Sequence, residues 1–248
     1  MKIYYWSPFT SNVATIKAVI NSAYGLKKIF QYDTSIINSF GEWNNYKKQI
    51  KLKKKNILNN PKKSNITSTE GYLFSRIAFV KIFFHSFLFL KKILIKKKPD
   101  YLIIHLITSL PLILFLIFKF DTKLILRISG LPKLNFFRRF LWKISKRNIN
   151  FITVPTKETL KNLKKMNIFD SSKIYYLPDP VFIKKQMNKN FLKKIKNDRQ
   201  YILNIGRLTE QKNQKILIKS FKEISKKYRN LKLLILGEGE KFIELSNL

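Results

Sequence analysis

The sequence predicts an α/β fold built on parallel sheets and divided into two domains. Strand-like and helix-like segments alternate along the 248 residues, which is typical of parallel sheets. Several strand segments, such as 102–104 and 233–236, are continuously apolar and fit sheets that are covered on both faces. Pro178 and Pro180 lie too close together to continue a strand or a helix, so we place the domain boundary there.

The first domain is predicted to begin directly with a strand, because residues 2–6 form a short apolar run. Ser11 is positioned to cap a helix over 12–27, and Thr156 to cap a later helix, since both hydroxyls precede helix-like segments. Residues 46–63 are rich in lysine and contain no acidic residue, which indicates a solvated loop or a frayed helix. The other expected elements are strands at 35–39, 100–105, 123–128, 150–154 and 173–177, and helices at 71–97, 110–120, 134–146 and 157–166.

The most informative motif lies in the last fifty residues. A short apolar strand at 201–205 leads into Gly206 and Arg207, and Lys212 follows five positions later. An amphipathic helix and a second apolar strand at 231–236 come next, which predicts a β-α-β unit with a phosphate-type turn. Without the flanking strands and helix, the arginine and lysine would be a weak signal, because a surface turn in a lysine-rich chain also explains them. The apolar stripe of the helix consists of Leu217, Phe221, Ile224 and Tyr228.

The chain is strongly basic, with 50 Lys and Arg residues against 14 Asp and Glu and a net charge of +36. This charge favours an anionic partner, although the abundance of lysine, asparagine and isoleucine is equally explained by AT-rich codons. We favour a membrane surface and expect no nucleic acid, because the aromatic residues lie in apolar runs and are not interleaved with basic ones. The chain has no cysteine, and its two histidines, His85 and His105, do not suggest a metal site.

Two apolar segments bear on membrane attachment. Residues 101–118 form an uncharged run that just reaches the length of a spanning helix. His105, Thr108 and Pro111 interrupt it, so a strand, a turn and a helix explain it better. The helix at 71–97 combines a wide apolar surface with lysines, and it fits either an interfacial helix on an anionic bilayer or an ordinary buried helix.

The β-α-β motif around Arg207 resembles the start of the donor-sugar domain of family 4 glycosyltransferases, which are retaining enzymes of the GT-B fold. The resemblance implies that Gly206, Arg207 and Lys212 bind the diphosphate of a nucleotide sugar. Cations and close backbone amides can stabilise the charge that develops on the leaving diphosphate without a metal, so we expect no cofactor. The loops that the resemblance places at the cleft contain Gly130, Gly237, Glu238 and Gly239.

The first domain shows a weaker form of the same resemblance. Asp100 precedes a strand that ends in His105, as in the family, which implies a histidine at the cleft; a core histidine is the alternative. Many members carry a histidine near the reacting sugar, directly before the glycine that corresponds to Gly130. Ser129 holds that position here, so the chain departs from the family pattern. Ser129 and His105 are the catalytic candidates that follow.

The resemblance implies a complete, acceptor-side Rossmann-like domain at 1–182, a linker at 183–199 and the first part of a donor-binding domain at 200–248. The family's paired glutamates, seven residues apart, lie further downstream than Leu248. We therefore expect a C-terminally truncated chain with little or no turnover.

The implied parent activity moves a sugar from a nucleotide-diphosphate sugar to a saccharide or lipid-linked acceptor. Its expected setting is bacterial envelope synthesis, such as lipopolysaccharide or capsule, in the cytoplasm or peripherally at the inner face of the cytoplasmic membrane. The alternative is a non-enzymatic basic α/β module that docks on an anionic membrane or on a partner enzyme.

Overall fold

The computed structural model describes residues 1–248 except 12, 51, 63, 65–71, 132–133 and 181–199. The chain divides into two compact units, residues 1–182 and 183–248. The linker predicted at 183–199 lies outside the described residues.

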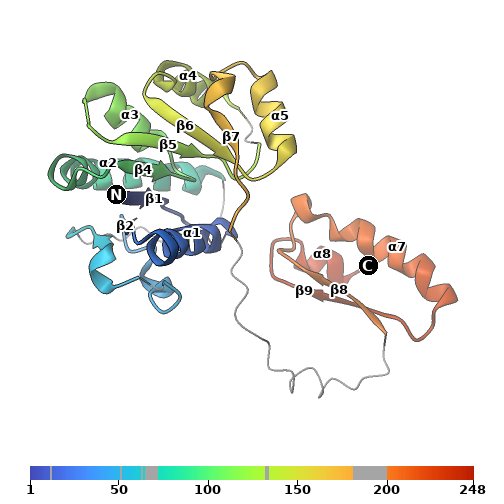
Figure 1. Ribbon diagram of the computed structural model, residues 1–248. Coiled ribbons are helices and arrows are strands. Elements are labelled where there is room, and N and C mark those ends of the chain that lie inside the picture. Colours follow the sequence, from blue (N-terminus) through green and yellow to red (C-terminus); the bar gives the residue numbers. More distant parts are fainter. Residues whose placement is uncertain (12, 51, 63, 65–71, 132–133, 181–199) are drawn as a thin grey trace. The chain divides into compact units, whose positions relative to one another are not determined.

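The first unit contains a seven-stranded sheet in the order β3-β2-β1-β4-β5-β6-β7, with every neighbouring pair parallel (Figure 1). This confirms the predicted parallel α/β fold. Its strands are β1 (Lys2–Trp6), β2 (Asp33–Asn38), β3 (Ile57–Asn59), β4 (Tyr101–Ile104), β5 (Lys123–Arg127), β6 (Ile149–Val154) and β7 (Ile174–Tyr176). Its helices are α1 (Thr15–Phe30), α2 (Tyr72–Lys97), α3 (Ser109–Ile117), α4 (Phe136–Ser145) and α5 (Lys157–Lys165), with short 3-10 turns η1 (Asn44–Tyr46), η2 (Lys54–Asn56) and η3 (Ser171–Lys173).

The sheet buries one hydrophobic core on each face, because alternate side chains of a strand point to opposite sides. Along β1, Ile3 and Tyr5 belong to the cluster that includes the buried face of α1. Tyr4 and Trp6 belong to the larger cluster, which draws side chains from α2, α3, α4 and α5. The apolar strands are therefore covered on both faces, as their composition predicts.

Two local predictions in this unit were wrong. Ser11 does not cap α1, which begins at Thr15 after Ala14 with no side-chain cap. The buried face of the helix starts only at Ile16, so packing against the sheet sets the boundary. The segment predicted as a loop or frayed helix contains β3, which pairs with β2. Three residues are too few to show a period, and tertiary pairing decides their conformation.

Other local predictions are confirmed. The Thr156 side chain accepts a hydrogen bond from the Thr159 amide at 3.0 Å and caps α5. The uncharged run at 101–118 folds as β4, a turn and α3. Among the described residues, no helix is long and apolar enough to cross a membrane.

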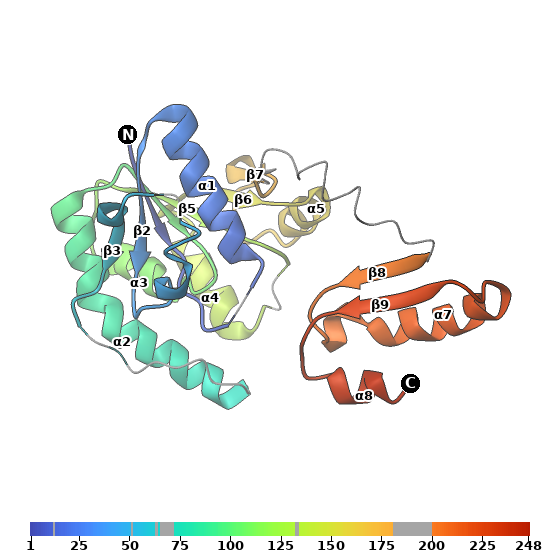
Figure 2. The same ribbon diagram turned by 90° about the horizontal axis from the view of Figure 1, so that it is seen from below.

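The second unit is a β-α-β arrangement with a short helix after it. It contains β8 (Tyr201–Ile205), the 3-10 turn η4 (Glu210–Lys212), α7 (Gln214–Lys227), β9 (Lys232–Leu236) and α8 (Phe242–Ser246). β8 and β9 pair in parallel, and α7 runs alongside them (Figure 2). This is the element order that the motif predicts.

Candidate functional site

The turns that follow β8 and β9 lie in direct backbone contact. The Gly206 amide donates to the Leu236 carbonyl at 3.0 Å, and the Leu208 amide donates to the Glu238 carbonyl at 2.9 Å. These bonds extend the two-stranded ladder into the residues that carry the predicted phosphate motif. Both turns lie at the carboxyl ends of parallel strands, where α/β proteins place their ligands.

Glycine is required at two positions of the second turn. A Cβ on Gly237 would lie 1.8 Å from the Gly206 carbonyl oxygen, and a Cβ on Gly239 would lie 2.3 Å from the Leu208 carbonyl oxygen. No side chain fits at such separations. The glycine-rich turn therefore lets the backbone of the two turns approach closely, and this structural role accounts for both glycines.

The two cations of the motif are exposed and available to an anion. Arg207 and Lys212 are both exposed, and neither side chain has a hydrogen-bond or ion-pair partner within the described part of the chain. By contrast, Lys215 and Lys241 nearby both form ion pairs with Glu244, at 3.1 and 2.7 Å, and Lys241 also pairs with Glu210 at 3.0 Å. The unit thus leaves unpaired the two cations that the sequence motif singles out.

Gln214 holds the backbone of this turn in place. It is the first residue of α7, only 2% exposed, and its Nε2 donates to the Arg207 carbonyl at 2.9 Å. Asn213, just before it, adopts the left-handed conformation with φ of 48°. Lys212 ends η4, immediately ahead of these residues, so it lies near the amino end of α7 as predicted.

In the first unit, the candidate residues lie where the strand order reverses. The chain runs from β1 to β2 in one direction and returns to β4 on the other side of β1. The carboxyl ends of such neighbouring strands form the crevice in which open α/β sheets bind ligands. A cavity of about 110 Å³ lies here, with Tyr5, Ser22, His105, Arg127 and Asp179 in its wall. It is smaller than the roughly 300–1,000 Å³ of ordinary ligand pockets.

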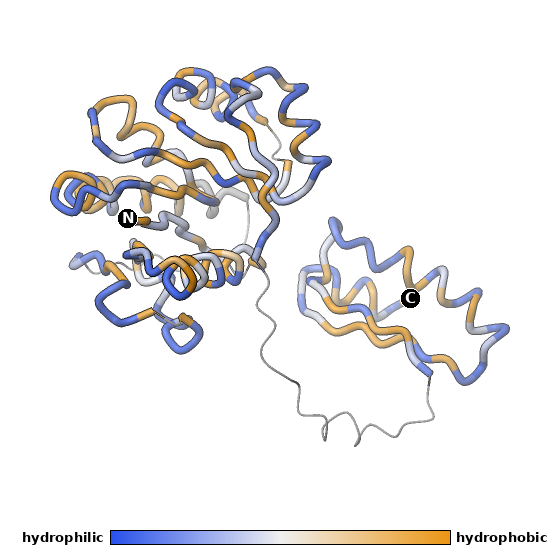
Figure 3. Tube along the Cα trace, in the orientation of Figure 1, coloured by the Kyte–Doolittle hydropathy of each residue, from blue (hydrophilic) through white to orange (hydrophobic). Residues whose placement is uncertain are grey.

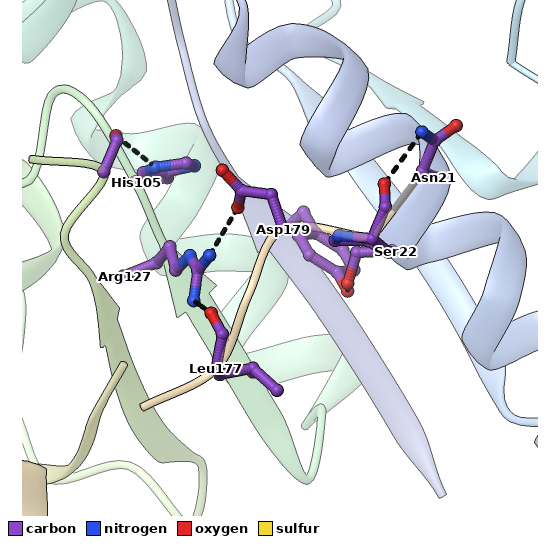
Figure 4. Close-up of polar contacts among 9 residues, drawn as sticks. Asn21, Ser22, His105, Arg127, Leu177 and Asp179 are labelled. Atoms are coloured by element: carbon purple, nitrogen blue, oxygen red, sulfur yellow. Dashed lines mark hydrogen bonds and ion pairs between the residues drawn. The ribbon is translucent and has the colours of Figure 1, made fainter. Parts of the chain in front are cut away.

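The structure brings the two catalytic candidates of the first unit together. Nε2 of His105, the residue after β4, lies 2.7 Å from the Ser129 hydroxyl, which follows β5 (Figure 4). His105 is 2% exposed, and its own amide donates to the Trp6 carbonyl at 2.9 Å. Ser129 is half-buried.

Burial lowers the pKa of His105 from its ordinary 6.5 to about 4. The positive charge of Arg127 lowers this pKa further, and the carboxylate of Asp179 partly opposes both effects. A neutral imidazole therefore faces Ser129 at neutral pH. A neutral ring has one donor and one acceptor nitrogen, so it can orient the hydroxyl in either sense.

The sequence did not reveal an ion pair that lies in the wall of this cavity. The guanidinium of Arg127, at the end of β5, donates to the Leu177 carbonyl at 2.5 Å and forms an ion pair with Asp179 (Figure 4). Arg127 is 8% exposed. An arginine that ends an apolar strand and an aspartate between two prolines were the available signals, but their 52-residue separation hides the pairing. Asn21 of α1 donates to the Pro180 carbonyl at 3.0 Å and ties down the same segment.

The remaining candidates differ in what surrounds them. Gly130 is exposed, and a Cβ there would meet no atom within 4 Å, so no steric demand explains this glycine. Glu238 is exposed, and its carbonyl is engaged by Leu208. Among the described residues, no group of three or more His, Asp or Glu side chains is placed to hold a metal ion.

Residues 185–248 match a family model described as glycosyl transferases group 1. An uncharacterized glycosyltransferase of Methanocaldococcus jannaschii is 34% identical over 175 residues, which cover 60% of this chain and 42% of the relative. The chain therefore spans less than half the length of that relative.

Solved structures show the same architecture. A glycosyltransferase from Rickettsia africae aligns with a TM-score of 0.64 and 13% identity over 99% of this chain and 62% of its own. HepE of Anabaena, in complex with UDP and glucose, aligns with a TM-score of 0.59 and 10% identity over 99% and 62%. The chain has a GT-B type fold. A UDP-GlcNAc 2-epimerase of M. jannaschii also aligns, with a TM-score of 0.54 and 15% identity over 94% and 65%, so this fold alone does not distinguish transfer from epimerisation.

Proposed function

We propose that the protein takes part in glycosyl transfer from a nucleotide-diphosphate sugar to a saccharide or lipid-linked acceptor. The observation that carries the proposal is the turn with Gly206, Arg207 and Lys212. It lies within the segment that matches glycosyl transferases group 1, and its two cations are exposed and unpaired among the described residues. The match to a glycosyltransferase family supports transfer over epimerisation, a choice that the fold leaves open.

In this proposal the two cations stabilise the leaving group. Negative charge grows on the nucleoside diphosphate as the bond to the sugar breaks. Arg207 offers a planar guanidinium whose donors match phosphate oxygens, and Lys212 adds a second charge near the amino end of α7. Preorganised charges of this kind act without reorganisation during the reaction. The proposed reaction proceeds with retention at the sugar carbon and without a metal.

In this proposal His105 and Ser129 contribute to binding of the sugar. The neutral His105 lies 2.7 Å from the Ser129 hydroxyl, and in the proposal this hydroxyl binds a hydroxyl group of the sugar. The ion pair of Arg127 with Asp179 anchors the segment after β7 beside them. The biological setting that we propose is the synthesis of cell-envelope polysaccharide.

The first test measures nucleotide binding. Titration calorimetry with UDP, GDP and ADP should detect binding of one of them, and inorganic pyrophosphate should compete. Arg207→Ala and Lys212→Ala should each weaken binding about 10- to 100-fold, since hydrogen bonds to charged groups contribute about 1.5–3 kcal/mol. Lys219→Ala, an exposed lysine on α7, is the matched control and should bind normally.

Equal losses in all three variants would show that net charge alone matters, and would remove the assigned roles. No saturable binding of any nucleoside diphosphate would overturn the proposal.

The stereochemistry has its own readout. Donor sugars should be hydrolysed slowly when no acceptor is present, with release of the nucleoside diphosphate. Proton NMR at early times should then show the free sugar in the same anomeric form as the donor. Release of the opposite anomer would contradict retention, and an unchanged rate after addition of a chelator is expected for a metal-independent reaction.

A further inference from the structure

The helices α2, α3 and α4 expose an unusual amount of apolar side chain. α3 contacts both α2 and α4, so the three form one continuous layer on the sheet (Figure 1). Phe136 and Phe137 of α4 are 84% and 78% exposed, and Phe84 of α2 is 73% exposed. The other exposed apolar residues of the layer are Ile77, Phe79, Val80, Leu88, Ile95, Leu116, Ile117, Phe140 and Ile144.

On α2 these residues form a stripe and not a scatter. Ile77, Val80, Phe84 and Leu88 follow one another at intervals of three or four positions, which places them along one side of the helix. Figure 3 shows apolar and polar stretches alternating along this helix. On α4, Phe136 and Phe140 stack with ring centroids 6.4 Å apart. Contiguous apolar surface of this kind marks an interaction site.

The same layer is basic and contains no acidic residue. α2 carries six Lys or Arg residues, α4 carries three, and none of the three helices contains Asp or Glu. Arg139 and Lys143 are exposed between the apolar residues of α4. α5 differs, because it carries Glu158 and no large exposed apolar residue among those described. α5 thus lacks the combination of exposed apolar and basic side chains that α2 and α4 carry.

A hollow beside α2 is also lined by both apolar and basic side chains. It measures about 540 Å³, and its wall includes the apolar side chains of Leu88, Phe89 and Ile93 together with Lys92 and Lys96. Leu88 belongs both to this wall and to the exposed stripe. The wall of this hollow therefore combines apolar and basic side chains, the two chemical features that an anionic amphiphile carries in complementary form.

We propose that the outer surface of α2, α3 and α4 docks on an anionic lipid bilayer. The phenylalanines would enter the boundary between headgroups and acyl chains, while the lysines and arginines contact lipid phosphates. A second copy of the chain is disfavoured as the occupant, because two surfaces without any acidic residue repel each other. Nucleic acid is disfavoured because it offers no apolar surface for so many exposed aliphatic and phenyl groups.

The test is co-sedimentation with phosphatidylcholine vesicles that contain or lack phosphatidylglycerol. The protein should bind only the anionic vesicles, and added salt should weaken binding. The triple variant Phe136→Ser, Phe137→Ser, Phe140→Ser should lower the partition coefficient at least tenfold. Its control, Ile29→Ser with Phe30→Ser, changes exposed apolar residues of α1, on the other face of the sheet, and should bind as the unaltered protein does.

A second pair of variants tests the charges at equal net charge. Arg139→Gln with Lys143→Gln should weaken binding about fivefold per charge removed. Lys161→Gln with Lys164→Gln removes two exposed charges from α5 and should have little effect.

Four results would overturn the proposal: no binding to anionic vesicles, equal binding to neutral ones, equal effects of the α4 and control variants, or binding of duplex DNA in place of vesicles. Self-association that the phenylalanine variants abolish, without any vesicle binding, would assign the surface to a second copy. Nucleotide binding by the α4 variants should stay unchanged, which separates this proposal from the proposed function.

Discussion

Replacing His105 with glutamine should change how the stability of the first unit depends on pH. Burial lowers the pKa of His105 from 6.5 to about 4 in the folded protein. Between these values the unfolded chain binds a proton that the folded protein does not, so acidification favours unfolding. A shift of this size corresponds to about 3 kcal/mol. That stability is fully present above pH 6.5 and is lost as the pH falls toward 4.

Glu42 should change the pH dependence of stability in the opposite direction to His105. Burial raises its pKa from 4.5 to about 7, although the amides of Ser39 and Phe40 donate to its carboxyl oxygens at 3.0 and 2.8 Å. Between pH 4.5 and 7 the folded protein holds a proton that the unfolded chain releases. Rising pH therefore destabilises the protein by about 3 kcal/mol over this window.

The two contributions overlap between pH 4.5 and 6.5 and should largely cancel in the unaltered protein. Removing one should reveal the other. His105→Gln should leave a protein whose stability falls as pH rises through this window, and Glu42→Gln should leave one whose stability rises. The quantity to compare is the difference in unfolding free energy between variant and unaltered protein at each pH. Any cost of the substitution that does not depend on pH is the same at every point and does not affect the trend.

The assay is urea unfolding at pH 4.5, 5.5 and 6.5, followed by tryptophan fluorescence. All three tryptophans, Trp6, Trp43 and Trp142, lie in the first unit, so the signal reports on that unit alone. A free-energy difference between His105→Gln and the unaltered protein that stays constant across these pH values would refute the reasoning.

Three further predictions concern stability. Gly237→Ala should destabilise the β8–β9 ladder by about 3 kcal/mol or more, because the new methyl group would overlap the Gly206 carbonyl. Hydrogen exchange of the ladder amides measures this loss. The control is Gly130→Ala, which has open space around it and should change the free energy of unfolding by no more than about 0.5 kcal/mol. Arg127→Met should lower the free energy of unfolding, measured in urea, by about 2–3 kcal/mol, because it removes two charge-assisted hydrogen bonds at a buried position. A decrease below about 0.5 kcal/mol would contradict a structural role for Arg127. Thr156→Ala should cost about 1 kcal/mol through loss of the α5 cap, and Thr156→Ser should restore most of it.

Long, regular segments were predictable from the sequence because their period is local. The strands β1 and β8 were predicted with the bounds that the structure shows, and α2 within one residue at its start. One short strand, β3, was not predicted, although β7 is equally short and was predicted at 173–177. β3 has three residues, and it is a strand only because β2 offers a free edge beside it. The start of α1 likewise depends on where the sheet begins to bury its side chains.

The candidate residues for chemistry, and their order along the chain, were predictable from local sequence patterns. Gly206, Arg207 and Lys212 form a motif because they are close in the chain, and a local turn suffices to bring them together. Which distant residues meet depends instead on how the strands are ordered in the folded sheet. The parallel sheet places the carboxyl ends of β4 and β5 side by side, so His105 reaches Ser129 across 24 positions. The order β5-β6-β7 brings the end of β7 to the same edge of the sheet, and Arg127 reaches Asp179 across 52 positions. Burial, which sets the pKa of His105, and exposure, which leaves the apolar stripe of α2 uncovered, depend on the packing of whole elements and cannot be read from any local pattern.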